Sequence, residues 1–332
     1  MRGPDAVVGG AVRVVAAALA LIASVAPVAL PARAAASSAA PAESIVSADS
    51  LSRLYRLILR SPSGVRTRAM LRVAPNRAGG RMAGVVVAGG FGSGWRAAEF
   101  LDPEPGFAVL SVDYPYEGRR SHISVSEILA RGRDLWRATH EASGLLVTAG
   151  DYLAGRPDVD STRIVLVGAS LGVPFALHAA AESDRFRALA LLYGCADLGR
   201  WVALNLRGMP RWMGGALGWL AGVLYGDYEP AHLIGRLSPR PVLLVNGRGD
   251  PRVPMDAARR LYEAAGNPRE QIWIDGAHVG EGERALLGRL LRVTVRWLRE
   301  SGLGPSVPAR GGAPPPAPDG GTRIPSRAAA PA

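Results

Sequence analysis

Three residue types that together can activate a hydroxyl group stand in one order along this chain. Ser170 is the centre of residues 168–172 (GASLG), which fit the pattern G-x-S-x-G. A serine hydroxyl is a poor nucleophile unless a base removes its proton. Of five histidines, His278 is the one in a loop just after an apolar run, and Asp250 lies in a loop after another such run. These residues predict nucleophilic catalysis, with Ser170 as nucleophile, His278 as base and Asp250 as the acid that orients the base.

Eight apolar runs predict the strands that must position these side chains. They cover residues 51–60, 65–74, 83–88, 107–112, 163–167, 188–193, 241–245 and 271–274. Helical spacing of apolar residues follows several of them, as at 127–155, 171–181, 255–265 and 284–299. This alternation predicts an α/β fold with a mostly parallel eight-stranded sheet flanked by helices. Since the carboxyl ends of parallel strands share one edge, we expect the three side chains to converge there.

The serine lies at a predicted strand-to-helix junction. A sharp turn there forces the central residue into a strained conformation and needs small residues on either side. The amide of Leu171, directly after the serine, is then one candidate donor for a developing oxyanion. A glycine-rich loop at residues 89–94 (GGFGSG) offers the second, at Phe91 or alternatively at Gly90. Chemistry of this kind uses no metal or organic cofactor.

Two alternatives arise from the same sequence. Asp197 follows the run at 188–193 and competes with Asp250 as the acid; the turn after Asp250 leads straight into a helix start, which favours Asp250. Residues 92–97 (GSGWRA) also fit the dinucleotide pattern G-x-G-x-x-A, with Asp113 about 20 residues further on. An NAD-binding oxidoreductase would leave Ser170, Asp250 and His278 without a role.

Composition changes at both ends divide the chain. Residues 1–34 combine arginines, an apolar stretch at 14–30 and an A-x-A site at 32–34, which predicts a signal peptide or, alternatively, an N-terminal anchor. We expect a disordered leader at 35–50, a catalytic domain at 51–303 and a disordered Pro/Ala/Gly-rich tail at 304–332. Residues 198–237 are too long for a simple crossover and predict a helical cap. The protein is therefore expected to be exported, to the periplasm or the medium, or else anchored in a membrane and facing outside.

Charge and cysteine content exclude several classes of protein. All 39 basic residues are arginine and the net charge is +11, but the arginines are scattered and form no basic run, so we expect no nucleic-acid binding. The single cysteine, Cys195, excludes an intramolecular disulfide and a cysteine-type zinc site. The expected partner is a small-molecule or acyl substrate. Membrane contact is expected only through an uncleaved N-terminal segment.

Five motifs in this order give the segment 51–303 a family resemblance. They are residues 85–94, 113–115, 160–172, 239–254 and 276–278. The segment resembles the α/β-hydrolase superfamily, near its dienelactone hydrolase and prolyl oligopeptidase-like branches. The resemblance implies a hydrolytic serine triad at Ser170, Asp250 and His278. Such loops often read His-Gly where this chain has Gly89 and Gly90, which leaves the orientation of the oxyanion loop open.

The resemblance leaves the substrate open. An esterase acting on a carboxylic ester is the first expectation, because the cap is apolar and favours an acyl or alkyl group. In that reading Trp212 and Trp219 of the cap set the preferred chain length. A serine peptidase or a thioesterase on the same fold is the alternative. A non-catalytic binding protein with this fold is a further one, since a fold does not guarantee an activity.

Overall fold

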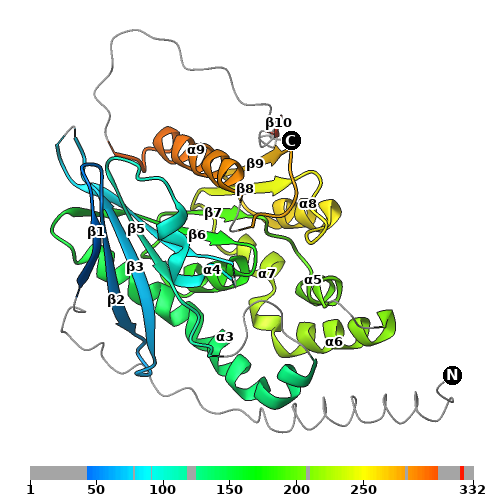
Figure 1. The fold of residues 1–332 in the computed structure, drawn as a ribbon. Coiled ribbons are helices and arrows are strands. Elements are labelled where there is room, and N and C mark those ends of the chain that lie inside the picture. Colours follow the sequence, from blue (N-terminus) through cyan, green and yellow to red (C-terminus); the bar gives the residue numbers. More distant parts are fainter. Residues whose placement is uncertain are drawn as a thin grey trace, which may run out of the picture.

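A ten-stranded sheet organises the computed structural model (Figure 1), which describes residues 43–77, 79–90, 92–117, 125–206, 210–280, 283–305 and 322–324. The strands are β1 (Ser44–Ala48), β2 (Arg53–Arg60), β3 (Arg66–Ala74), β4 (Met82–Ala88), β5 (Phe107–Val112), β6 (Val159–Ala169), β7 (Ala188–Leu192), β8 (Val242–Gly247), β9 (Arg269–Ile274) and β10 (Thr322–Ile324). The helices are η1 (Gly94–Arg96), α2 (Ala97–Phe100), α3 (Val125–Ala154), α4 (Gly172–Ala181), α5 (Leu198–Asn205), α6 (Arg211–Leu224), η2 (Gly226–Tyr228), α7 (Pro230–Gly235), α8 (Met255–Ala264) and α9 (Arg284–Glu300).

The order of the strands places the carboxyl ends of six of them at one edge. Across the sheet the order is β1-β2-β3-β5-β4-β6-β7-β8-β9-β10. Strands β5, β4, β6, β7, β8 and β9 pair in parallel, while β1, β2, β3 and β10 pair antiparallel with their neighbours. The predicted mostly parallel sheet flanked by helices is therefore confirmed.

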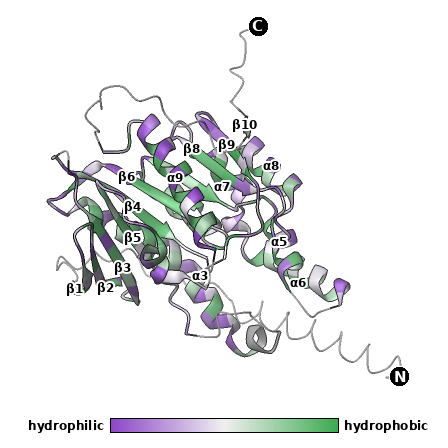
Figure 2. Cartoon of the chain, turned by 45° about the horizontal axis from the view of Figure 1, so that its top comes forward, coloured by the Kyte–Doolittle hydropathy of each residue, from purple (hydrophilic) through white to green (hydrophobic). Residues whose placement is uncertain are grey.

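Two apolar clusters lie on the two faces of the sheet. Alternate residues of β4 separate them: Val86 and Ala88 belong to the cluster beneath α3 and α4, whereas Val85 and Val87 belong to the cluster beneath α9. The central strands are apolar along their whole length in Figure 2, as expected for strands that are covered on both faces. This double burial holds the carboxyl edge rigid.

The sheet has one more strand at each edge than the eight expected. Residues 44–48, expected to be part of a disordered leader, form β1 on β2, and residues 322–324, in the expected disordered tail, form β10 on β9. All five residues of β1 are exposed. An edge strand of this kind is held by backbone hydrogen bonds, so it leaves no apolar pattern in the sequence. The remaining residues of the expected signal peptide, leader and tail lie outside the described part of the chain, except for residues 43, 49 and 50 of the leader and 304–305 at the start of the tail.

The segment between β7 and β8 forms the predicted helical cap. It contains α5, α6, η2 and α7. In Figures 1 and 2, α5 and α6 project from the end of the sheet where the parallel strands finish. Within the described ranges, no helix combines the length and the apolar character that a membrane span requires.

Candidate active site

Ser170 occupies a sharp turn between β6 and α4. Strand β6 ends at Ala169 and helix α4 begins at Gly172. Ser170 has a φ of 53°, a conformation that side chains rarely adopt. Its amide donates to the carbonyl of Leu192 at 2.8 Å, and its own carbonyl accepts from the amide of Val173 at 3.0 Å. These hydrogen bonds hold the strained residue at the tip of the turn.

The glycine two residues after the serine makes this turn possible. A Cβ atom on Gly172 would lie 2.0 Å from the carbonyl oxygen of Ala88 on the neighbouring β4. A Cβ on Gly168 would lie 2.9 Å from the Cβ of Ala176. The G-x-S-x-G spacing therefore follows from packing: helix α4 must pass directly over two strands.

His278 and Asp250 complete a chain of hydrogen bonds that starts at Ser170. The serine Oγ lies 2.8 Å from Nε2 of His278, and Nδ1 of His278 lies 2.7 Å from Oδ2 of Asp250. His278 follows β9 and Asp250 follows β8, so all three residues come from the same edge of the sheet. Only 7% of the His278 side chain and 1% of the Asp250 side chain are exposed.

The surroundings of Asp250 favour an ionised carboxylate with a fixed direction. Its Oδ1 accepts hydrogen bonds from the amides of Arg252 at 2.7 Å and Val253 at 3.2 Å. Hydrogen bonds from amides stabilise a buried carboxylate, which would otherwise be costly. With Oδ1 occupied in this way, Oδ2 is directed at the imidazole. The carboxylate thereby favours the tautomer of His278 that has a proton on Nδ1 and a free lone pair on Nε2 toward the serine.

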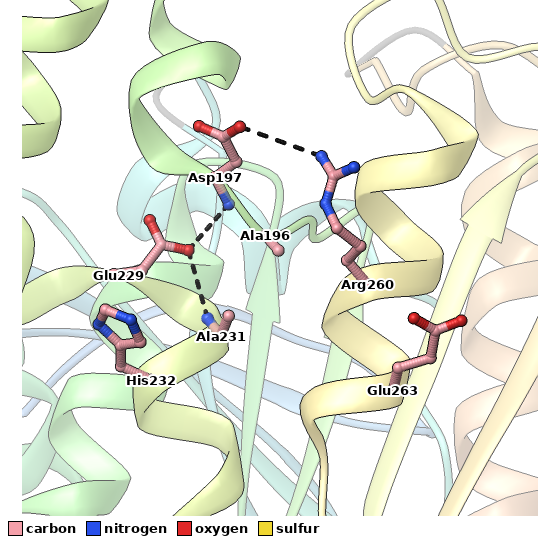
Figure 3. Close-up of a pocket in the computed structure, with 7 residues that line it drawn as sticks. All are labelled: Ala196, Asp197, Glu229, Ala231, His232, Arg260 and Glu263. Atoms are coloured by element: carbon pink, nitrogen blue, oxygen red, sulfur yellow. Dashed lines mark hydrogen bonds and ion pairs between the residues drawn. The ribbon is translucent and has the colours of Figure 1, made fainter.

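The competing acid, Asp197, lies in a different place, shown in Figure 3. Its side chain accepts from the amide of Arg200 at 2.9 Å and lies 4.0 Å from the guanidinium of Arg260. Its amide donates to Glu229 at 2.8 Å. These groups line an open hollow of about 490 Å³ between α5, α7 and α8. The structure thus brings Asp250 to His278, and gives Asp197 a role at the start of α5.

The two predicted oxyanion donors fare differently. Leu171 is the residue that caps the start of α4, so its amide lies at the positive end of that helix. Phe91 lies outside the described residues. Two carbonyl groups of the loop accept hydrogen bonds. The carbonyl of Gly90 accepts from the amide of Gly94 within the loop at 3.0 Å, and the carbonyl of Gly89 accepts from the hydroxyl of Tyr114, after β5, at 2.5 Å.

Tyr193 was missed by sequence reasoning and packs directly on the imidazole. Its ring meets that of His278 edge to face, with centroids 5.2 Å apart. It follows β7 immediately, has a φ of 57° and is almost fully buried. Burial, followed by the nearby charge of Asp250, raises the pKa of Tyr193 to about 12, so the phenol is neutral. An aromatic residue just after the strand next to that of the nucleophile was the available signal.

The two cap tryptophans expected to set the acyl chain length are largely exposed. The side chains of Trp212 and Trp219 on α6 are 49% and 69% exposed. Their role in choosing the acyl chain length stays a prediction. Trp201 on α5 instead packs inward against both apolar clusters. The apolar sequence of α6 does not show which side of the helix faces solvent, because glycines lie on its buried side.

The residues of the dinucleotide pattern have structural contacts in this fold. Both Nε and Nη2 of Arg68 donate to Oδ2 of Asp113, at 3.2 and 2.9 Å, so this carboxylate is already engaged at the end of β5. Of the pattern 92–97, residues 94–96 form the 3-10 turn η1 that leads into α2. In the described parts of the chain, no cluster of three or more His, Cys, Asp or Glu residues has a metal-binding arrangement.

Comparison with known proteins shows what the chain is similar to. Residues 146–300 match the model of the prolyl oligopeptidase family, Peptidase_S9. The protein YfhR of Escherichia coli (strain K12) is 27% identical over 196 residues, which are 58% of this chain and 60% of YfhR. This chain thus matches about 60% of the length of that relative.

Solved structures share the fold at low sequence identity. A puromycin-hydrolyzing peptidase of Mycobacterium tuberculosis superposes with a TM-score of 0.53 and 21% identity, covering 75% of this chain and 39% of the peptidase. Acetyl xylan esterase 1 of Thermoanaerobacterium sp. JW/SL YS485 superposes with a TM-score of 0.50 and 19% identity, covering 76% of this chain and 89% of the esterase. Taken together, the sheet and these superpositions show that the chain has the α/β-hydrolase fold, and its residues 146–300 are similar to the prolyl oligopeptidase family.

Proposed function

We propose that this protein is a serine hydrolase that cleaves an ester-type acyl bond, with Ser170 as nucleophile, His278 as base and Asp250 as the orienting acid. The observation that carries the proposal is the continuous hydrogen-bonded chain Ser170–His278–Asp250, with distances of 2.8 and 2.7 Å. Its start at a strained residue on a strand-to-helix turn is typical of a nucleophile elbow.

The proposed reaction has two halves. The Oγ of Ser170 attacks the carbonyl carbon while Nε2 of His278 takes the hydroxyl proton, and Asp250 stabilises the resulting imidazolium. The amide of Leu171 and one from loop 89–94, which we assign to Phe91, bind the oxyanion. His278 then gives the proton to the leaving alcohol as the C–O bond breaks. Water attacks the acyl-enzyme by the same route and releases the acid and free Ser170.

A fluorophosphonate probe and a p-nitrophenyl ester test this proposal together. The wild-type protein is expected to be labelled and to hydrolyse the ester. Ser170→Ala is expected to lose labelling altogether and ester hydrolysis by at least about 10³-fold. Hydrolysis that persists in a folded Ser170→Ala protein would refute the mechanism. A folded wild-type protein that is neither labelled nor active would favour the non-catalytic binding alternative.

Peptide bond cleavage is the second candidate activity, and the match of residues 146–300 to the prolyl oligopeptidase family favours it. The same Ser170, His278 and Asp250 would serve, with an amine as leaving group. Comparing kcat/KM on p-nitrophenyl esters, aminoacyl p-nitroanilides and acyl thioesters of matched acyl groups discriminates among the three activities. A higher value on the anilides than on the esters assigns the protein to the peptidases.

We further propose that the protein is exported, on the pattern of residues 1–34. N-terminal sequencing of the protein recovered from cells tests this. A mature terminus just after residue 34 supports a cleaved signal peptide, whereas an intact terminus in the membrane fraction supports an anchor.

A further inference from the structure

Helix α6 buries Gly214, Gly218 and Leu220 and exposes both of its tryptophans. Trp212, Trp219 and Val223 are respectively 49%, 69% and 58% exposed, and Ala216 between them is also exposed. Their spacing of four, three and four residues puts them on one face of the helix. We call residues 212, 216, 219 and 223 the outer stripe of α6. A helix at the surface of a soluble domain normally turns such a stripe inward.

Glycines explain why the stripe cannot face the domain. Gly214 and Gly218, together with Leu220, are the buried residues of α6, which packs on α5. A Cβ on Gly218 would lie 2.4 Å from the carbonyl oxygen of Gly199, and one on Gly199 would lie 2.7 Å from the carbonyl oxygen of Gly218. The two helices are therefore in backbone contact, and no rotation of α6 could bring a tryptophan between them. The outward direction of the stripe is a built feature of this helix pair.

The charged residues of the segment that carries the outer stripe are basic up to residue 226, and the exposed Asp227 follows it. Residues 198–226 include three arginines and no aspartate or glutamate, although the chain as a whole has 28 acidic residues. Arg200 forms an ion pair with Asp256 at 2.5 Å, Arg207 lies outside the described residues, and Arg211 is exposed at the first position of α6. The chain carries a net charge of +11. An apolar stripe that begins beside the exposed Arg211, on a chain of positive net charge, complements a surface that is apolar within and anionic outside.

These features fit a helix that lies on a lipid surface better than a helix that crosses a bilayer. The 14 residues of α6 extend about 21 Å, less than the roughly 30 Å of a bilayer core. Indole rings favour the boundary between headgroups and acyl chains. Short helices with tryptophan on one face and arginine at the margin lie along that boundary. In Figures 1 and 2, α6 is an outermost helix at the end of the sheet where the parallel strands finish.

We propose that the outer stripe of α6 inserts into the interfacial region of an anionic phospholipid bilayer and docks the protein there. This revises the sequence-based expectation that membrane contact occurs only through the N-terminal segment. The docking is a binding property and is independent of the reaction at Ser170.

Sedimentation of the full-length protein with sucrose-loaded vesicles tests the proposal. The vesicles contain phosphatidylglycerol and phosphatidylcholine in equal amounts, or phosphatidylcholine alone. Trp212→Ser/Trp219→Ser is expected to partition into the anionic vesicles at least about 30-fold less than the wild type. Arg211→Glu is expected to weaken binding to the anionic vesicles severalfold without changing binding to neutral ones.

Ile45→Ser/Leu51→Ser is the matched control, because Ile45 and Leu51 are 66% and 50% exposed near the other edge of the sheet. It removes comparable exposed apolar surface and is expected to leave partitioning unchanged. The N-terminal segment is present in every variant, so its own affinity for lipid cancels from the comparison. Circular dichroism confirms that each variant is folded.

Two results would overturn the proposal. The first is equal partitioning of the wild type and Trp212→Ser/Trp219→Ser, which would assign lipid binding to another part of the chain or show that there is none. The second is a concentration-dependent dimer in analytical ultracentrifugation that this variant abolishes, with no effect of lipid. That result would make a second copy of the chain the occupant of the outer stripe.

Discussion

Two aspartates follow neighbouring strands at the same edge of the sheet, yet their surroundings differ in almost every respect. Asp250, after β8, is 1% exposed and bonds to an imidazole and two amides. Asp197, after β7, is 48% exposed, caps α5 and faces Arg260 across an open hollow. The comparison shows that the edge of a parallel sheet supplies candidates, while burial and partners decide which of them can orient a base.

The energetics of the two carboxylates differ for the same reason. An exposed ion pair such as Asp197–Arg260 contributes about 0–1 kcal/mol, because water screens it. A buried carboxylate has no such screening, and its interaction with a neighbouring imidazolium is correspondingly stronger. The charge of Asp250 therefore acts strongly on the imidazole of His278 beside Ser170, whereas the charge of Asp197 acts weakly and on Arg260.

The largest effect is expected from substituting the two aspartates in parallel. Asp250→Asn is expected to lower kcat on a p-nitrophenyl ester by about 10³–10⁴-fold, since an amide that donates to the imidazole fixes the wrong tautomer. Asp197→Asn is expected to change kcat by less than about threefold, because Asp197 touches neither His278 nor Ser170 in the structure.

Fluorophosphonate labelling rates provide a second reading of the same pair, because they depend on the activation of Ser170 alone. The assignment fails if Asp197→Asn loses as much activity as Asp250→Asn while both proteins remain folded.

A smaller effect is expected on stability, and here the order of the two sites reverses. Asp197 has a φ of 66° and accepts the amide of Arg200 as the N-cap of α5. Asn tolerates this left-handed conformation and can cap a helix, whereas Ala does neither. Asp197→Ala is therefore expected to lower the free energy of unfolding by about 1–2 kcal/mol, and Asp197→Asn by less than about 0.5 kcal/mol. Urea denaturation measures both.

Equal loss of stability in Asp197→Ala and Asp197→Asn would show that the charge opposite Arg260, rather than the cap, stabilises this region. Ester hydrolysis by both variants serves as the control and is expected to stay near the wild-type value.

The sequence predicted what buried, periodic segments encode. The eight central strands, the elbow at Ser170 and the positions of His278 and Asp250 all follow from apolar runs and the loops after them. The contacts among the three side chains were expected only because parallel strands end at one edge, and the structure supplies the distances.

The features that the sequence did not reveal depend on the direction in which side chains point or on hydrogen bonds between backbones. Strands β1 and β10 are held by edge hydrogen bonds and have no apolar signature. The outward direction of Trp212 and Trp219 follows from glycine contacts between α5 and α6, which no periodicity displays. The place of Tyr193 just after β7 is visible in the sequence, but its positive φ and its contact with the ring of His278 are not.

The smallest effect concerns a half-buried histidine on α4. His178 on α4 stacks on Tyr228, the residue before Glu229, with ring centroids 4.3 Å apart. Burial lowers the pKa of His178, while the charge of Glu182 opposes this shift. The folded protein therefore binds this proton less readily than the unfolded chain, and stability is lost as the pH falls from above about 6.5 through the lower folded pKa.

His178→Phe keeps a ring against Tyr228 and removes the titration. The decrease in the free energy of unfolding between pH 7.5 and pH 5.5 is expected to be smaller in this variant, by a fraction of a kcal/mol. The pH profile of kcat is expected to remain that of the wild type, because His178 packs on Tyr228, away from the hydrogen-bonded chain of Ser170, His278 and Asp250. A profile that shifts in His178→Phe would mean that the two regions are coupled through α4, which begins two residues after Ser170 and contains His178.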